Sequence, residues 1–100
     1  MEKVTNIRDF HNILSRNEYV FLDVYADWCG PCREIAPKIE ELIPDYSNIK
    51  FITINSDEMG DLANELNIKR LPTFILFNEA KELERIKRGN IKEVIKMLDG

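Results

Sequence analysis

The chain contains two cysteines, and only two residues separate them, in the segment Trp28-Cys29-Gly30-Pro31-Cys32. If Cys29 lies at the start of a helix and Cys32 one turn inside it, their Cβ atoms face each other at about 4 Å, and the two can form a disulfide. A β-rich run precedes this segment and a helical pattern follows it. That context is typical of a thiol–disulfide redox site.

Two other interpretations of the cysteine pair are possible. The first is a pair of structural core cysteines, but Gly30-Pro31 makes a poor core helix and suits the entry to one. The second is half of a zinc site, but zinc usually takes four ligands, and the single histidine, His11, is distant and expected on the surface. We therefore expect no metal.

Asp23 is the other residue that could do chemistry, since it interrupts an otherwise apolar run over residues 19–26. It shares a strand face with Phe21 and Tyr25, so burial should raise the pKa of its carboxyl. A carboxyl that titrates near neutral pH can take the proton of Cys32, directly or through a water. The alternative, a carboxyl that only accepts hydrogen bonds from the backbone, stays open.

The elements that must position these residues follow from hydrophobic periodicity and from turn residues. Strands are predicted over residues 4–5, 19–26, 50–55, 73–77 and 82–88. Helices are predicted from a cap at Asn6, over 33–46 with Pro37 inside, over about 59–66 with a cap at Ser56 or Asp57, and over 91–98 with a cap at Asn90. Right-handed crossovers make the first three strands parallel, and the short turn at 78–81 makes the last two antiparallel.

Composition bounds the class of protein. One hundred residues, of which 44% are hydrophobic and 32% charged, predict a single globular domain over 1–100. The net charge is −4 and the basic residues are scattered, so we expect no nucleic-acid partner. No apolar segment approaches the roughly 20 residues that cross a bilayer, and no signal peptide is visible, so we expect no membrane partner and a cytoplasmic location.

Taken together, these residues resemble the thioredoxin family over essentially the whole chain. The order β-α-β-α-β-α-β-β-α is that of the thioredoxin fold, an α/β fold in which four helices flank a mixed five-stranded sheet. Four features match the family beside the cysteine motif: Asp23 six positions before Cys29, Pro37 in the active-site helix, the Leu71-Pro72-Thr73 loop with its cis-proline, and Gly89 beside the substrate groove.

The resemblance implies a protein-disulfide reductase that works by reversible dithiol/disulfide exchange. Cys29 would attack a target disulfide, and Cys32 would resolve the mixed disulfide with Asp23 as its base. The implied substrate-binding residues form a flat apolar patch: Trp28, Gly30, Pro31, Leu71, Pro72 and Gly89. Pro31 between the cysteines favours a reducing pair.

The implied partners are disulfide-containing client proteins and a thioredoxin reductase, either NADPH-dependent or a ferredoxin-dependent equivalent, that recycles this electron carrier. We expect a monomer that needs no cofactor and serves electron transport and cell redox homeostasis. Two alternatives remain: an isomerase or oxidase of the same fold, and a binding module whose thiols are incidental.

The sequence departs from the family at a few positions. Thr53 stands where many thioredoxins have a lysine beside the buried aspartate, which bears on how Asp23 is tuned. Ala80 stands where a hairpin glycine is common, so the turn type could differ. Arg70 and Arg88 add positive charge to the rim of the expected groove, which favours acidic partner surfaces.

Overall fold

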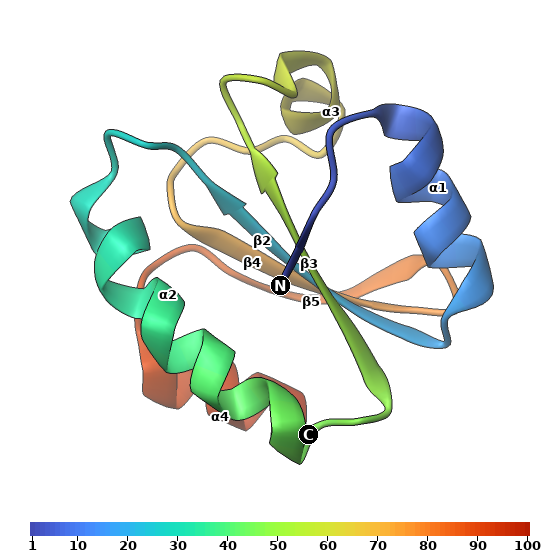
Figure 1. The fold of residues 1–100 in the computed structure, drawn as a ribbon, viewed down its shortest axis with the longest axis vertical. Helices are drawn as coiled ribbons and strands as arrows, with labels where there is room; N and C mark the ends of the chain where they lie inside the picture. The colour runs from blue at the N-terminus through green and yellow to red at the C-terminus, as the bar shows by residue number, and fades with distance from the viewer.

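The computed structural model describes residues 1–100 and has the element order that the sequence predicts. The strands are β1 (Glu2–Lys3), β2 (Tyr19–Tyr25), β3 (Ile49–Asn55), β4 (Thr73–Asn78) and β5 (Lys81–Ile86). The helices are α1 (Ile7–Arg16), α2 (Gly30–Leu42), the short 3-10 helix η1 (Ile43–Asp45), α3 (Gly60–Glu65) and α4 (Ile91–Asp99) (Figure 1). None of these helices is both long and apolar enough to cross a membrane.

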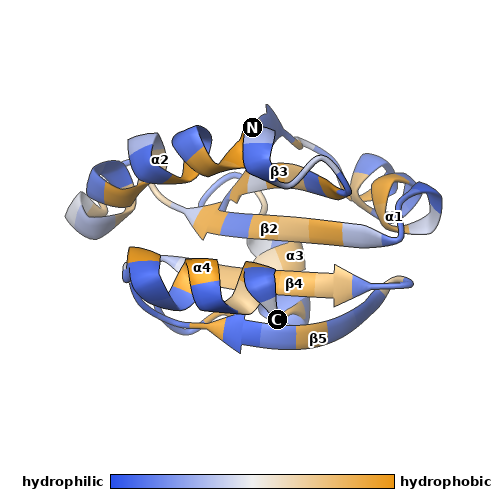
Figure 2. Cartoon of the chain, turned by 90° about the horizontal axis from the view of Figure 1, so that it is seen from below, coloured by the Kyte–Doolittle hydropathy of each residue, from blue (hydrophilic) through white to orange (hydrophobic).

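The five strands form one mixed sheet in the order β1-β3-β2-β4-β5. The strands β1, β3 and β2 are parallel, and β4 is antiparallel to both β2 and β5, as predicted. The strand β2 lies at the centre, where Asp23 is in register with Thr53 on one side and Phe74 on the other. Figure 2 shows apolar residues along β2 and β4 and a largely hydrophilic β5.

Alternation along β2 divides the core between the two faces of the sheet. Val20, Leu22 and Val24 belong to a buried cluster covered by α1 and α3. Phe21 belongs to a second cluster, with residues of α2 and α4. Side chains two residues apart on a strand share a face, so Asp23 points to the α2 side of the sheet.

Several element boundaries differ from the sequence prediction. The apolar period of this helix begins only at residue 33, but α2 begins at Gly30, directly after Cys29, as the cysteine pair led us to expect; Cys29 caps it and Pro31 fits its first turn. It ends at Leu42, and Pro44 lies in η1. The strand β1 pairs through Glu2 and Lys3, two residues earlier than expected, although the Val4 N–H still donates to the Thr53 carbonyl at 2.9 Å.

Helix caps were predicted correctly at two of three positions. The side chains of Asn6 and Asn90 each accept a backbone N–H, from Asp9 and Glu93 respectively. The expected cap of α3 at Ser56 or Asp57 is wrong, since α3 starts after Met59 without a side-chain cap.

The β4–β5 hairpin uses an unusual turn for its residues. Glu79 and Ala80 both have positive φ, 51° and 65°, as a two-residue type I′ turn requires. The register then shifts, because Leu76 pairs with Glu84 and Phe77 with Glu82. Leu83 is left as the extra residue of a β-bulge and is exposed, whereas Ile86 is buried.

Candidate redox site

The two cysteines form a disulfide at the start of α2, with their Cα atoms 5.3 Å apart. Cys29 is the N-cap residue, and its Sγ accepts a hydrogen bond from the Cys32 N–H at 3.2 Å. Pro31 in the first turn has no N–H to leave unpaired. The free N–H groups and the dipole of α2 therefore point at the Cys29 sulfur, where they stabilise negative charge.

Burial does not distinguish the two cysteines. Cys29 is 4% exposed and Cys32 5%, so both are buried to the same degree in the disulfide form. Their surroundings do differ: Cys29 caps the helix, whereas Cys32 lines a cavity of about 410 Å³ behind the disulfide. The asymmetry between the two sulfurs is thus one of electrostatic environment.

The cavity behind Cys32 connects it with Asp23. Asp23, Cys32, Arg33, Glu40 and Thr53 contribute to its lining, together with Met1, Tyr25, Ala26, Asp27 and Ala36. A cavity of this size, lined in part by the acidic residues Asp23 and Glu40, has room for water molecules, which need about 30 Å³ each in the liquid. The cavity therefore leaves room for a water between the Asp23 carboxyl and the Cys32 sulfur.

The Asp23 carboxyl is buried without a hydrogen bond. The residue is 4% exposed, and its Oδ1 has no partner. Burial, and next the negative charge of Glu40, raise the pKa of Asp23 from 3.8 to about 7, while the N-terminal ammonium opposes the shift. The structure therefore gives no support to the alternative in which this carboxyl only binds the backbone.

Thr53 and Glu40 line the cavity beside Asp23, and neither is a cation. The Thr53 hydroxyl donates to the backbone carbonyl of Asp23 at 2.8 Å, so it does not bind the carboxyl. Glu40 forms an ion pair with the ammonium of Met1 at 2.5 Å. The negative charge of Glu40 is therefore partly compensated within the same cavity.

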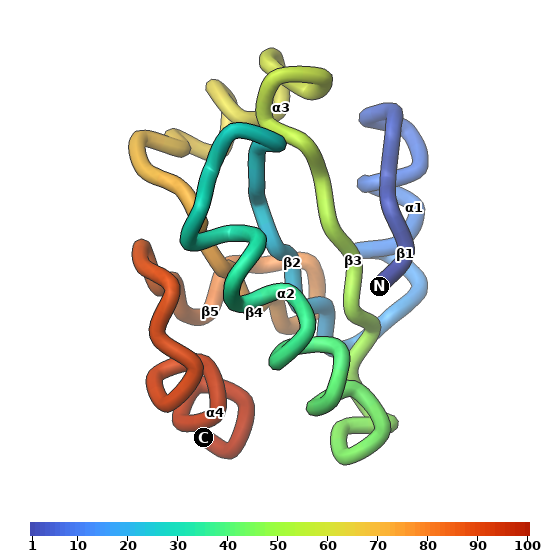
Figure 3. The backbone as a smooth tube through the Cα atoms, turned by 60° about the vertical axis from the view of Figure 1, so that its left-hand side comes forward, coloured from blue at the N-terminus to red at the C-terminus, as the bar shows by residue number.

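Three loops meet beside the disulfide at one end of the sheet. The Leu71–Pro72 peptide is cis, and Leu71 packs against Cys29 and Cys32. A Cβ atom on Gly89 would lie 3.5 Å from the Pro31 carbonyl oxygen and 3.6 Å from Pro72 Cγ, so Gly89 lies beside both prolines and a side chain there would contact them at ordinary van der Waals distance. Figures 1 and 3 show the start of α2, the loop before β4 and the link between β5 and α4 close together.

Trp28 stands at the edge of this surface. Trp28 is 69% exposed, so its indole ring is not part of the core. The Trp28 Nε1–H donates to Asp57 Oδ2 at 3.0 Å. Sequence reasoning treated Asp57 only as a helix cap and missed this contact, because nothing in the local pattern links two residues so far apart.

Two further observations complete the site. The Arg33 guanidinium, which the sequence did not single out, donates to the Asp27 carbonyl at 2.6 Å beside the cavity. Gly30 is the first residue of α2, and a Cβ atom there would meet nothing closer than Arg33 Nη2 at 4.0 Å. No three His, Cys, Asp or Glu side chains are grouped so that they could hold a metal ion.

A disulfide held at the start of a helix, with a proton acceptor behind its second sulfur, exchanges readily with the thiols of other proteins. The fold and the site together define the class of thiol–disulfide oxidoreductases. Comparison with protein families narrows this further, since the thioredoxin family model matches residues 2–99. The chain belongs to the thioredoxin family.

Individual relatives agree with this assignment. A thioredoxin from Aspergillus fumigatus is 40% identical over 88% of this chain and 82% of its own length. Thioredoxin-2 from Pyricularia oryzae is 38% identical over 90% of this chain, which spans only 53% of that protein. Among solved structures, oxidised mitochondrial thioredoxin 3 from Saccharomyces cerevisiae superposes with a TM-score of 0.95 at 31% identity, covering 99% of this chain and 93% of its own.

Proposed function

We propose that the chain is a protein-disulfide reductase in which Cys29 is the nucleophile and Cys32 the resolving thiol. The observation that carries this proposal is the difference between the two sulfurs. Cys29 Sγ caps α2 and accepts the Cys32 N–H, while Cys32 faces the cavity that contains Asp23. A helix N-terminus favours a thiolate, and a neighbouring carboxyl can remove a proton from a thiol.

The reaction starts from the dithiol form. The Cys29 thiolate attacks one sulfur of a client disulfide, the client S–S bond breaks, and one client sulfur leaves as a thiolate. Cys32 then gives its proton to Asp23, directly or through a water, and attacks Cys29 Sγ. The second client thiolate leaves, two electrons have passed to the client, and the Cys29–Cys32 disulfide remains.

The client would bind over the disulfide. Trp28, Gly30, Pro31, Leu71, Pro72 and Gly89 are the residues proposed to contact it. The meeting of Pro31, Pro72 and Gly89 beside Cys29 supports this role. An extended client segment could pair with backbone groups of the Leu71 loop, in the manner of an added β-strand.

The reductant that restores the dithiol is proposed to be a thioredoxin reductase, supplied with electrons by NADPH or by ferredoxin. A reductase of this kind works in a compartment that keeps thiols reduced, and we propose the cytoplasm. A carrier that docks alternately on clients and on its donor must leave its disulfide face free, which favours a monomer.

Alkylation of the reduced protein tests the assignment of the two thiols. Reduced protein is treated with iodoacetamide at about pH 7, and labelling of each cysteine is followed by mass spectrometry. We expect Cys29 to react at least about tenfold faster than Cys32, because the helix terminus raises its thiolate fraction. Equal, slow labelling of both thiols would contradict the proposal.

Turnover tests the function itself. Insulin reduction is measured with dithiothreitol, and with NADPH and a thioredoxin reductase, for the wild type, Cys29→Ser and Cys32→Ser. We expect Cys29→Ser to be inactive and Cys32→Ser to accumulate a mixed disulfide. A binding module with incidental thiols would tolerate Cys29→Ser, and an oxidase would show a less negative reduction potential against glutathione than a reductase.

A further inference from the structure

A surface pocket of about 500 Å³ adjoins the proposed client groove, between the loop before β4, the end of β5 and the start of α4. Five of its eight lining residues are cationic: Arg70, Arg85, Lys87, Arg88 and Lys96. Two are anionic, so the lining carries a net charge of +3 in a chain whose net charge is −4. We call this surface the basic pocket.

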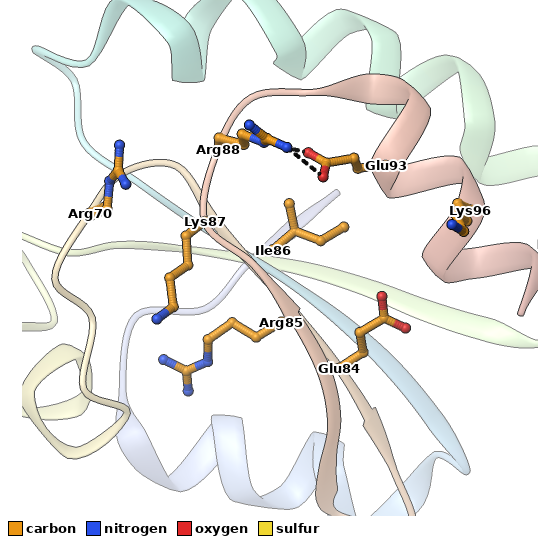
Figure 4. A pocket seen from close by; sticks show the side chains of 8 residues that line it. All are labelled: Arg70, Glu84, Arg85, Ile86, Lys87, Arg88, Glu93 and Lys96. Carbon is orange, nitrogen blue, oxygen red and sulfur yellow. Dashed lines mark hydrogen bonds and ion pairs between the residues drawn. The ribbon is translucent and has the colours of Figure 1, made fainter.

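Part of this positive charge is not neutralised by the protein. Arg85 is held by Glu82 through two hydrogen bonds. Arg88 is held in the same way by Glu93 (Figure 4). None of the ion pairs in the structure involves Arg70, Lys87 or Lys96.

Arg70 and Lys87 are also exposed, so their charges are available to a partner.

The basic pocket shares its loops with the client groove. Arg70 directly precedes Leu71, which packs against the disulfide, and Arg88 directly precedes Gly89, whose Cα lies against Pro31 and Pro72. An extended chain advances about 3.3 Å per residue. A client segment lying on Leu71 would therefore bring side chains only a few residues from its cysteine within reach of the basic pocket.

We propose that the basic pocket binds the carboxylates of client segments that carry Asp or Glu within a few residues of their disulfide cysteine. This inference rests on the proposed reductase function and specifies its preferred substrate class. Arginine pairs with carboxylates through two parallel hydrogen bonds, and a concentrated positive charge attracts acidic segments before contact. The occupant is therefore an acidic protein segment, reduced faster than a neutral one of the same length.

Three disulfide peptides of equal length test this preference. They differ only in the residues that flank the cysteine, which are Glu, Gln or Lys. The pre-reduced full chain is mixed with each peptide, and oxidation is followed through the fluorescence of Trp28, the only tryptophan. We expect the Glu peptide to react about tenfold faster than the Gln peptide at low ionic strength, and the Lys peptide to react slowest. At about 0.5 M salt the Glu/Gln ratio should fall to about twofold.

A pair of double variants separates the effect of the basic pocket on the reduction rate from the effect of net charge. The test variant is Arg70→Glu with Lys87→Glu, and the control is Arg16→Glu with Lys81→Glu, which changes the net charge equally. Both control residues are exposed, lie outside the ion pairs and belong to the opposite end of the sheet, since Arg16 precedes β2 whereas Cys29 follows it. We expect the test variant to lose the preference for Glu peptides and the control to keep it.

The outcomes also separate this inference from the proposed function. If no peptide is reduced, the reductase function itself fails. If all three are reduced at equal rates, or if both double variants lose the preference equally, only the basic pocket assignment fails. Inhibition by a single-stranded RNA as strong as that by a Glu peptide lacking cysteine would overturn the acidic-protein occupant. Should the test variant not fold, Arg70→Gln with Lys87→Gln replaces it, with about half the effect.

Discussion

Asp23 makes the proton content of the folded chain differ from that of the unfolded chain. Its pKa is about 7 in the fold and 3.8 as its ordinary value, mainly because the carboxyl is buried. Between these values the folded protein holds a proton that the unfolded protein has released, so the contribution of Asp23 lowers stability as pH rises through this window. Asp23, the residue proposed to take the Cys32 proton, therefore weakens the fold at neutral and alkaline pH.

Replacing the Asp23 carboxyl by an amide should remove this loss of stability. We expect Asp23→Asn to raise the free energy of unfolding of the oxidised protein by up to about 4 kcal/mol at about pH 8, and by little near pH 4. Urea denaturation at the two pH values measures this change in the free energy of unfolding. The variant should also slow release of client from the mixed disulfide, seen by quenched-flow mass spectrometry. An unchanged resolution rate would remove Asp23 from the mechanism.

Glu40 gives a second test at the residue scale. Its negative charge raises the pKa of Asp23, and it holds the N-terminal ammonium that acts in the opposite direction. We expect Glu40→Gln to lower the pKa of Asp23, measured by the carboxyl carbon NMR shift against pH. The neighbouring Glu41→Gln is the matched control, since Glu41 does not line the cavity and should leave the titration unchanged.

At the scale of elements, the β4–β5 hairpin is built with residues poorly suited to its turn. Ala80 has a φ of 65°, where a Cβ atom costs about 1–2 kcal/mol. Glycine avoids this cost but loses about 0.4–1 kcal/mol through the greater freedom of the unfolded chain. We therefore expect Ala80→Gly to stabilise the protein by about 0.5–1 kcal/mol in urea denaturation. Ala80→Ser, which keeps the Cβ atom, should give no such gain.

The contact between Trp28 and Asp57 ties the active-site loop to the segment that follows β3. Removing the acceptor with Asp57→Ala should cost about 1 kcal/mol and loosen the indole ring. Time-resolved fluorescence anisotropy of Trp28 measures the second effect directly. Asp57→Asn keeps an acceptor oxygen and should behave nearly as the wild type. Equal mobility in both variants would mean that packing, not this hydrogen bond, holds the ring.

Much of the arrangement of elements was predictable, because each strand and long helix carries its own apolar period. The start of α2 was predictable from the cysteine pair and not from periodicity, because Gly30, Pro31 and Cys32 have no apolar period and the helix there is defined by its cap. The cis peptide at Pro72 was expected only from the family resemblance. The hydrogen bond between Trp28 and Asp57, and the effect of the Glu40 charge on Asp23, arise only when strands and helices pack together, so the local sequence does not reveal them.

At the scale of the whole molecule, β2 couples both halves of the core. Phe21 packs on the α2 face and Leu22 on the α1 face of the same strand. We expect Phe21→Ala and Leu22→Ala each to cost about 3–5 kcal/mol. For each variant, circular dichroism and Trp28 fluorescence should report one coincident urea transition, as a single domain requires. Separate transitions would show that the redox end unfolds independently.

Each edge strand of the sheet is protected from pairing with a further strand, and the feature that protects it differs between the two edges. On one side β1 is only two residues long, which is too short to template another chain. On the other, β5 has a pair of charged residues on each side of the bulge at Leu83, which interrupts the ladder. With neither edge able to pair with a strand of another copy, the protein can stay dispersed at high concentration and avoid lateral growth into fibrils.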